Sequence, residues 1–268
     1  MTEQPPLAKM KDQVYVDPRP KEHFDQYHHR SRTKQPNWVY HVVRMTTTIY
    51  SYAFFRMRAL AAENVPHTGP VIVAPNHFSF MDHFFTGAPI RRKVRFMAKS
   101  QLFSGLQKHI YTHGGVFPVR RGARDEEAFI TAGKILNEGG VVAMYCEGGR
   151  SRTGKLSERA KPGIGRLALE TGAAIVPVAI YGSSKVRNWK RLQFPKVTVQ
   201  YGKPIAFERV AEPTREQMQA VADQIFEEIK ALYGELERSG RRSVIARIRA
   251  QRRADRRARR GRGFASAA

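Results

Sequence analysis

The sequence contains one cysteine and no sign of an export signal. Cys146 has no second cysteine with which to form an intrachain disulfide, which fits a reducing compartment. Residues 1–20 lack the apolar core of a secretory signal peptide, so we expect the protein on the cytosolic side. We find no internal repeat, and 268 residues with 41% hydrophobic content suit one folded domain with appendages.

Acidic residues are scarce, because 23 Asp and Glu face 47 Lys and Arg, for a net charge of +24. Residues 238–262 hold twelve arginines and one aspartate, a balance of +11, which leaves 24 − 11 = +13 on the rest. Both parts are basic, which predicts a polyanionic partner. Nucleic acid, an anionic membrane and phosphate-bearing substrates all fit, and charge alone does not choose among them.

Composition divides the chain into four parts. Residues 1–36 are polar and rich in proline, and they predict a flexible leader. Residues 37–56 predict an amphipathic helix, residues 57–237 the folded domain, and residues 238–268 an arginine-rich tail. In that tail, a short basic helix around Val244 is expected to give way to a disordered cationic extension.

The helix predicted over residues 38–55 has one apolar side. Trp38, Val42, Met45 and Ile49 recur at steps of four and three. Its length approaches the thickness of a bilayer, but Arg44 near its middle would cost about 2.5 to 3.5 kcal/mol in a membrane span. We therefore predict a helix that lies at an interface. The alternative is a surface helix that packs on the domain's own core.

Short apolar runs alternate with helical patterns from residue 71 onward, which predicts an α/β domain whose mostly parallel or mixed sheet is flanked by helices. Predicted strands cover residues 71–74, 94–98, 115–119, 141–146, 174–181 and 197–201. Predicted helices cover residues 81–88, 125–137 and 163–171. A last helix begins after Thr214, which forms a capping box with Gln217. Pro177 interrupts its strand and indicates a sheet edge or a bulge.

An imidazole and a carboxylate, His77 and Asp82, lie five positions apart just after the apolar run 71–74. Residues five apart do not face each other on one helix, but a loop histidine can meet an aspartate from the first turn of the next helix. Asp82 would then fix the tautomer of His77, so that its other nitrogen can remove a proton from an alcohol. The plainer alternative is a loop histidine bonded to a helix-capping aspartate.

A second group of polar residues follows the predicted strand 141–146. Gly148 and Gly149 would let the backbone approach a ligand, and three cations within residues 150–155 would suit a phosphate. Glu147 would hold those arginines or accept a hydrogen bond from a substrate hydroxyl. The order of residues is not that of a Walker A loop. A solvated surface turn remains the alternative.

Four segments, in this order and spacing, closely resemble the glycerolipid acyltransferase family typified by bacterial 1-acyl-glycerol-3-phosphate acyltransferase, over roughly residues 55–210. The family's HxxxxD box matches His77 and Asp82, and the arginine that ends its second motif matches Arg121, with Arg120 one position away. The third motif, usually Pro-Glu-Gly-Thr-Arg, corresponds to residues 146–150. The proline of the fourth corresponds to Pro177. Cysteine and glycine here replace the usual proline and threonine of the third motif, which leaves the acceptor specificity open.

The resemblance implies transfer of a fatty acyl group from acyl-CoA or acyl-carrier protein to a hydroxyl of a glycerol-phosphate lipid, with the sn-2 hydroxyl of lysophosphatidate preferred and another lysophospholipid as the alternative. It implies His77 as base, Asp82 as its partner, and a binding role for the acceptor's phosphate and glycerol end, shared by Arg120, Arg121, Glu147, Gly148 and Arg150. No metal or other cofactor and no acyl-enzyme is expected. Cys146 is expected to be a buried structural thiol. The expected location is peripheral, on the cytoplasmic side of an anionic membrane.

Two rival functions follow from the same residues. His77, Asp82 and His83 suggest a metal hydrolase, although position 79, where a further histidine ligand would be expected, is serine. The arginine-rich tail suggests a nucleic-acid-binding protein, with nucleic acid the less favoured partner.

Overall fold

A mixed seven-stranded sheet forms the centre of the part of the chain that the structure describes. The structure is a computed structural model that describes residue 7 and residues 16–120, 125–186 and 192–265, with side chains to residue 254. The strands are β1 (Arg58–Leu60), β2 (Val71–Pro75), β3 (Val94–Lys99), β4 (Phe117–Val119), β5 (Val141–Ala143), β6 (Ala174–Tyr181) and β7 (Thr198–Tyr201). Their order is β1-β7-β6-β2-β5-β3-β4, and only the pair β6 and β7 is antiparallel. The predicted fold class is confirmed.

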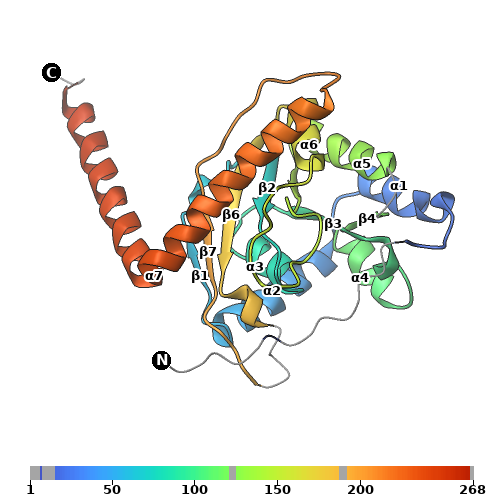
Figure 1. Ribbon diagram of the computed structural model, residues 1–268, viewed down its shortest axis with the longest axis horizontal. Helices are drawn as coiled ribbons and strands as arrows, with labels where there is room; N and C mark the ends of the chain where they lie inside the picture. Colours follow the sequence, from blue (N-terminus) through green and yellow to red (C-terminus); the bar gives the residue numbers. More distant parts are fainter. Residues whose placement is uncertain (1–6, 8–15, 121–124, 187–191, 266–268) are drawn as a thin grey trace.

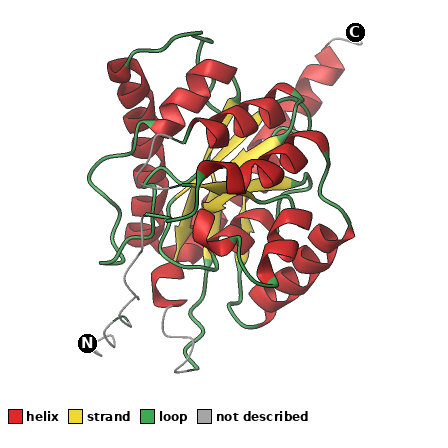
Figure 2. Ribbon diagram, turned by 90° about the vertical axis from the view of Figure 1, so that its right-hand side faces the viewer, coloured by secondary structure: helices red, strands yellow, loops and turns green. Residues whose placement is uncertain are grey.

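Helices cover both faces of this sheet (Figures 1 and 2). They are α1 (Asp25–Thr33), α2 (Trp38–Ala53), α3 (Asp82–Gly87), α4 (Gln107–His113), α5 (Glu126–Asn137), α6 (Gly163–Thr171) and α7 (Arg215–Ala265), with 3-10 turns at Lys21–Phe24, Ala62–Asn64 and Ser100–Leu102. Alternate residues of β2 serve the two cores. Val71 and Val73 pack with Phe85 of α3, while Ile72 packs with the buried side chains of α5, α6 and α7, such as Ile225.

The direction of the strands decides which loops share an edge of the sheet. β2, β5 and β6 are parallel, so the loops after β2 and β5 leave at one edge. β7 runs the opposite way, and β1 is parallel to β7. Because Thr198 pairs with Tyr181 at the end of β6, and Arg58 with Thr198, the start of β1 lies at this same carboxyl edge.

The predicted flexible leader is wrong for its second half. Residues 21–33 are helical, and Phe24 and Tyr27 are buried with Phe103 in a small apolar cluster. His28 Nδ1 lies 2.9 Å from Thr131 Oγ1 of α5, so α1 is fixed to the domain. The few apolar residues of this polar segment lie on one side and are all used in packing. Most of residues 1–15 lie outside the described residues.

Pro177 lies in an interior strand, so the predicted sheet edge is wrong. The alternative, a bulge, fits the pairing beside it, because Val178 pairs with Tyr201 and Ile175 with Ile205, which sets three residue steps on β6 against four on the other segment. β6 has β2 on one side and β7 on the other. Ile175 donates its N–H to Ile205 on the β7 side, and alternation puts the nitrogen of Pro177 on that side too. The ladder with β7 begins only at Val178, so the missing donor of proline falls where β7 has not yet joined.

Helix α2 presents its apolar side outward. Trp38 is 70% exposed, Met45 59% and Ile49 63%, whereas Ser51 on the other side is fully buried. Arg44 also points inward and donates to the carbonyl of Ala88 at 3.3 Å. The predicted amphipathic helix is confirmed, but the four residues of its predicted apolar side do not pack on the domain's core. None of the helices in the described ranges is both long and apolar enough to span a membrane.

Helix α7 begins as predicted and then differs from prediction. The capping box forms, with the Thr214 N–H donating to Gln217 Oε1 at 2.8 Å and the Gln217 N–H donating to Thr214 Oγ1 at 3.3 Å. The helix bends at Gly240, whose φ of 70° and ψ of 158° are not helical, and continues to Ala265 (Figure 1). The predicted disordered extension is therefore helical, and Val244 is buried beside Leu60 of β1.

Candidate active site

The loop after β2 and the start of α3 bring His77 and Asp82 together. His77 Nδ1 lies 2.9 Å from Asp82 Oδ2, and the backbone N–H groups of Phe78 and Ser79 donate to the same oxygen at 2.6 and 2.7 Å. Asp82 is fully buried. The carboxylate therefore closes the turn and holds the ring at once, as the five-residue spacing predicted.

These bonds fix which ring nitrogen of His77 can act as a base. Because Asp82 Oδ2 already accepts from two backbone donors, it is an acceptor for the Nδ1–H of His77 as well. The neutral ring then carries its basic lone pair on Nε2. His77 is 8% exposed, so the ring is held in a largely dry site.

Asn76 anchors the residue before His77 to the neighbouring strand. Its side-chain oxygen accepts from the N–H of Ile180 at 2.7 Å, and its side-chain nitrogen donates to the carbonyl of Ile180 at 3.3 Å. The amide thus imitates one more step of the ladder between β2 and β6. His77 consequently leaves the sheet from a fixed point.

The ring of Tyr145 stacks on the imidazole of His77. The two ring centroids lie 3.8 Å apart with 15° between the planes. The Tyr145 hydroxyl is buried and has no hydrogen-bond partner among the described residues. Burial, helped by the nearby charge of Asp82, raises the pKa of Tyr145 well above its usual value, so the phenol stays neutral. The sequence did not indicate this residue, because a tyrosine at the end of a predicted strand is expected simply to pack in the hydrophobic core.

Glu147 ties three segments of the site together. One oxygen accepts from the N–H of His77 at 2.7 Å, and the other accepts from the N–H and the hydroxyl of Ser157, both at 3.1 Å. Burial raises the pKa of Glu147, while these hydrogen bonds lower it. Both oxygens already bind protein donors, which makes this carboxylate a support for the His77 loop. Its binding of a substrate stays a prediction.

The loop that carries Arg150 is fixed to His77 through the backbone. The N–H of Ser151 donates to the carbonyl of His77 at 2.8 Å. Gly148 adopts a φ of 67°, in the left-handed region that favours glycine. The charge of Arg150 helps to lower the pKa of His83, the residue next to Asp82. The structure therefore brings Gly148 and Arg150 to the side of the predicted base.

The second predicted arginine motif is only partly described. Arg120 follows β4, which is three strands from β2, or roughly 14 Å at about 4.8 Å per strand. The N–H of Arg120 donates to Asp125 at 2.6 Å, and its guanidinium donates to the carbonyl of Arg19 at 3.5 Å. Arg121 lies outside the described residues. The contacts of Arg120 do not include His77.

Cys146, the possible nucleophile, is buried, and His83, the possible metal ligand, is half-buried. Burial, and secondarily the charge of Glu147, raises the pKa of the Cys146 thiol far above its usual range, which confirms the predicted buried thiol. Burial lowers the pKa of His83 to about 4, and its ring contacts Phe84 and Phe96. Across the described residues, no group of three or more His, Cys, Asp or Glu side chains is placed to hold a metal ion.

An apolar cavity of about 200 Å³ lies next to this site, enclosed by α2, α3, β3 and α4. His83 and Gly87 of α3 line it, as do Val43 of α2, Phe96 of β3 and Ile110 of α4. His83 directly follows Asp82, so the cavity reaches the residue next to the pair, although neither His77 nor Asp82 lines it. Its lining comes from four separate elements, and no sequence pattern indicated it.

Comparison with known proteins shows which family the chain resembles. Residues 56–181, from the residues before β1 to the end of β6, match the family model described as Acyltransferase. The match covers just under half of the chain, and it confirms the resemblance to the acyltransferase family that the motifs predicted.

Three similar proteins are named 1-acyl-sn-glycerol-3-phosphate acyltransferase. Chloroplastic LPAT1 of Arabidopsis thaliana is 27% identical over 54% of this chain and 41% of its own length. Chloroplastic BAT2 of Brassica napus is 26% identical over 54% and 43%, and the protein of Borreliella burgdorferi is 29% identical over 46% and 50%. The matched region thus spans half or less of each of these curated relatives.

A solved structure supports the fold. The crystal structure of the 1-acyl-sn-glycerophosphate acyltransferase PlsC from Thermotoga maritima aligns with a TM-score of 0.55 at 23% identity. The alignment covers 78% of this chain and 89% of that chain. The fold similarity extends beyond the 56–181 region to the flanking elements.

Proposed function

We propose that this protein transfers a fatty acyl group from a thioester, acyl-CoA or acyl-carrier protein, to a hydroxyl of a glycerol-phosphate lipid, and that the preferred acceptor is the sn-2 hydroxyl of lysophosphatidate. The observation that carries the proposal is the contact of 2.9 Å between His77 Nδ1 and a buried Asp82, which sets His77 Nε2 as a base. The names of the relatives support the choice of acceptor.

The chemistry is a direct transfer. His77 Nε2 takes the proton of the acceptor hydroxyl while its oxygen attacks the thioester carbonyl, and Asp82 stabilises the imidazolium that forms. The tetrahedral intermediate then collapses, the C–S bond breaks, and the leaving thiolate takes the proton from His77. A base positioned in this way contributes about 10²- to 10⁴-fold. No cofactor beyond the acyl thioester takes part in this scheme.

The acceptor's phosphate and glycerol end is proposed to lie on the loop of Gly148 and Arg150. Their position beside His77 and the exposed backbone of Gly148 support this. Arg120 and Arg121 are proposed as further cations for the phosphate. Glu147 contributes by holding the His77 loop in place.

The apolar cavity beside α3 is proposed to take an acyl chain. It reaches His83, the residue after Asp82, and is lined mainly by apolar side chains, including Val94 and Phe96 of β3. Burial keeps His83 neutral at the cavity wall, because its pKa of about 4 lies well below neutral pH. An acyl chain fits such a lining, because burying its methylene groups is favourable.

The protein is proposed to act at the cytoplasmic surface of an anionic membrane, bound peripherally. The exposed apolar side of α2 and the net charge of +24 support this location. The arginine-rich half of α7 contributes to the same attraction. The lysophospholipid acceptor is itself a component of that surface.

The test is a transfer assay with purified protein, radiolabelled acyl-CoA or acyl-carrier protein, and a panel of detergent-dispersed lysolipids. We expect product with lysophosphatidate and none with His77→Ala, at an unchanged melting temperature. Arg150→Ala is expected to raise chiefly the KM for the acceptor. Turnover retained by a folded His77→Ala variant contradicts the mechanism. A preference for another lysophospholipid contradicts only the assignment of the acceptor.

A further inference from the structure

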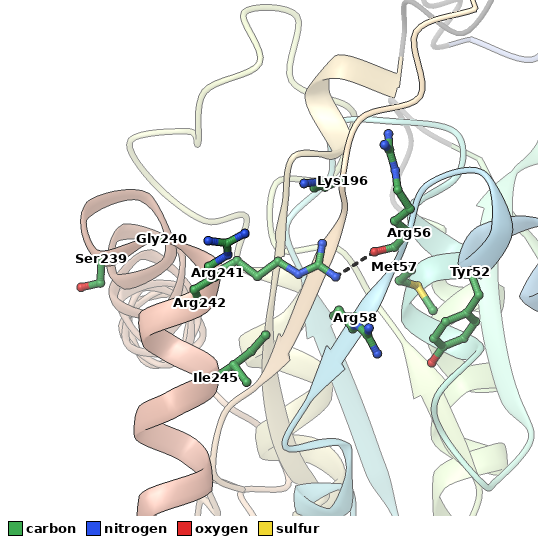
Figure 3. A pocket seen from close by; sticks show the side chains of 10 residues that line it. All are labelled: Tyr52, Arg56, Met57, Arg58, Lys196, Ser239, Gly240, Arg241, Arg242 and Ile245. Carbon is green, nitrogen blue, oxygen red and sulfur yellow. Dashed lines mark hydrogen bonds between the residues drawn. The ribbon is translucent and has the colours of Figure 1, made fainter.

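A basic pocket of about 830 Å³ lies where α7 bends at Gly240, away from His77 and the apolar cavity. Residues 239–242 and Ile245 of α7 form one wall (Figure 3). Residues 56–58, Tyr52 of α2 and Lys196 form the other. We call this the Gly240 pocket. It is built from three distant parts of the chain.

Five cations line the Gly240 pocket: Arg56, Arg58, Lys196, Arg241 and Arg242. In the described parts of the chain, none of the five forms an ion pair with a carboxylate. The arginines farther along α7 differ, since Arg247 pairs with Glu235 at 2.6 Å and Arg252 pairs with Glu63. The cations of the pocket are thus gathered without the acids that neutralise their neighbours.

The cations are held close enough to oppose one another. The guanidinium of Arg241 crosses the pocket and donates to the carbonyl of Arg56 at 2.8 Å (Figure 3). Burial, and then the charges of Arg58 and Arg56, lowers the pKa of Arg241. An anion bound among these groups relieves that repulsion, and a phosphate suits arginine because it can accept paired hydrogen bonds.

The pocket continues the exposed apolar side of α2. That side runs through Trp38, Val42, Met45 and Ile49 and ends at Tyr52, which is 43% exposed and lines the pocket. Large apolar side chains beside a group of cations match the two layers of a membrane surface, in which acyl chains lie below phosphate headgroups. A soluble anion would account for the cations, but it would leave the adjoining apolar residues without a role.

We propose that the Gly240 pocket binds the phosphate headgroup of an anionic phospholipid in the bilayer surface. The proposal extends the peripheral membrane location given above to a defined site. Arg58, at the start of β1, lies at the same edge of the sheet as the carboxyl end of β2, three strands away and so at roughly 14 Å. A headgroup bound here therefore orients this edge of the sheet, which carries His77, toward the membrane. The acceptor of the proposed reaction lies in that membrane.

The experiment measures binding of the full chain to vesicles of phosphatidylcholine with and without phosphatidylglycerol. The Arg58→Gln/Arg242→Gln variant removes two pocket cations, and Arg249→Gln/Arg253→Gln removes two exposed arginines of α7 outside the pocket. We expect the first to weaken binding to anionic vesicles by about 30-fold, at about tenfold per 1.4 kcal/mol and about 1 kcal/mol per cation. The second, which has the same net charge, is expected to weaken it less than threefold. Equal losses overturn the proposal, because binding would then follow net charge alone.

Gly240→Ala tests the shape of the pocket without removing a charge. An added Cβ meets no atom within 4 Å, but the φ of 70° is strained for alanine. We expect the variant to fold and to lose at least tenfold in affinity for anionic vesicles. Wild-type binding by this variant together with wild-type binding by Arg58→Gln/Arg242→Gln overturns the site.

Competition identifies the source of the phosphate. Inorganic phosphate, coenzyme A and a short single-stranded RNA are each added to the wild-type protein on anionic vesicles. We expect none to displace the protein at concentrations equal to that of accessible phosphatidylglycerol. Displacement by any of them that is lost in the Arg58→Gln/Arg242→Gln variant overturns the lipid assignment.

The outcome is separate from that of the proposed reaction. His77→Ala is expected to bind vesicles as the wild type does. Arg58→Gln/Arg242→Gln is expected to keep its transfer rate on detergent-dispersed acceptor. Absence of transfer activity with intact, pocket-dependent vesicle binding contradicts the proposed reaction and leaves the headgroup site standing.

Discussion

The surroundings of His77 and the Gly240 pocket lie at the same edge of the sheet, but their charged groups differ in burial and in hydrogen bonding. Around His77, the charged groups are buried and bonded, with Asp82 accepting three hydrogen bonds and Glu147 another three. In the pocket, Arg58, Lys196 and Arg242 are exposed. One region is arranged before any substrate arrives, and the other presents charge to a partner.

The two groups of charges therefore have different roles. Buried and bonded groups act on the side chains that surround them, and salt screens them little. Exposed cations act over about 10 Å and are screened by salt, so they suit attraction to a surface. Replacing a charged side chain by an uncharged one is therefore expected to lower the rate of the reaction in the first region and binding to the membrane in the second.

The largest expected effect tests the buried region directly. Asp82→Asn keeps the size of the side chain but replaces one acceptor oxygen by an NH₂ group. Asp82 Oδ1 has no hydrogen-bond partner among the described residues, so the amide oxygen can keep the place of Oδ2. The substitution then removes the negative charge that stabilises the imidazolium, and we expect kcat to fall by about 10²- to 10⁴-fold. The assay uses detergent-dispersed acceptor, so that membrane attachment plays no part.

Arg242→Gln is the matched control, because it also replaces one charged side chain by an uncharged one, in the Gly240 pocket. It is expected to leave kcat in that assay within twofold. If Asp82→Asn keeps more than a tenth of the wild-type kcat, then the negative charge of the buried carboxylate does not stabilise the imidazolium of His77. The comparison between the two regions then fails.

The next effect concerns stability and pH. Burial lowers the pKa of His83 to about 4 from the usual 6.5, so the folded protein resists a proton that the unfolded chain accepts. The stabilisation is complete above pH 6.5 and is lost as the pH falls from 6.5 to 4. It corresponds to about 3 kcal/mol. The pocket arginines stay charged throughout this range and contribute nothing to the slope.

Denaturant unfolding at several values of pH measures this effect. His83→Gln is expected to lose about 3 kcal/mol less than the wild type between pH 6.5 and pH 4. His67→Gln, at an exposed position, provides the control and is expected to follow the wild type. Parallel curves for wild type and His83→Gln would show that His83 takes up its proton without cost in the folded state.

The sequence predicted the elements whose signal is local. The strand over residues 174–181 and the helix over residues 163–171 have the predicted bounds, because a continuous apolar run and a 3.6-residue pattern each lie within one element. The capping box marked the start of α7 for the same reason. Segments with few apolar residues, such as α1 and the three-residue β1, carried too little pattern to be recognised.

The site was predictable where its partners are near in sequence. The contact of His77 with Asp82 spans five residues, but the contact of His77 with Glu147 spans seventy and depends on the pairing of β2 with β5. The sequence therefore indicated that Glu147 belongs to a loop of the site, but it did not indicate which groups Glu147 binds. The Gly240 pocket was harder still, because a glycine among arginines gives no sign of a bend.

The smallest expected effect concerns the ring that lies on His77. Tyr145→Leu removes the stacking at 3.8 Å, and aromatic pairs of this kind are worth about 0.5 to 1.5 kcal/mol, so we expect kcat to fall by roughly 2- to 10-fold with little change in KM. Tyr145→Phe keeps the ring and removes a buried hydroxyl that has no partner among the described residues, so its kcat and its free energy of unfolding are expected to match or slightly exceed those of the wild type.

The two variants are compared by kcat and by the dependence of kcat on pH, because a ring that only fills space would not move the titration of His77. An equal loss in both variants would assign the effect to the hydroxyl, and the preorganisation of the buried region would then rest on hydrogen bonds alone.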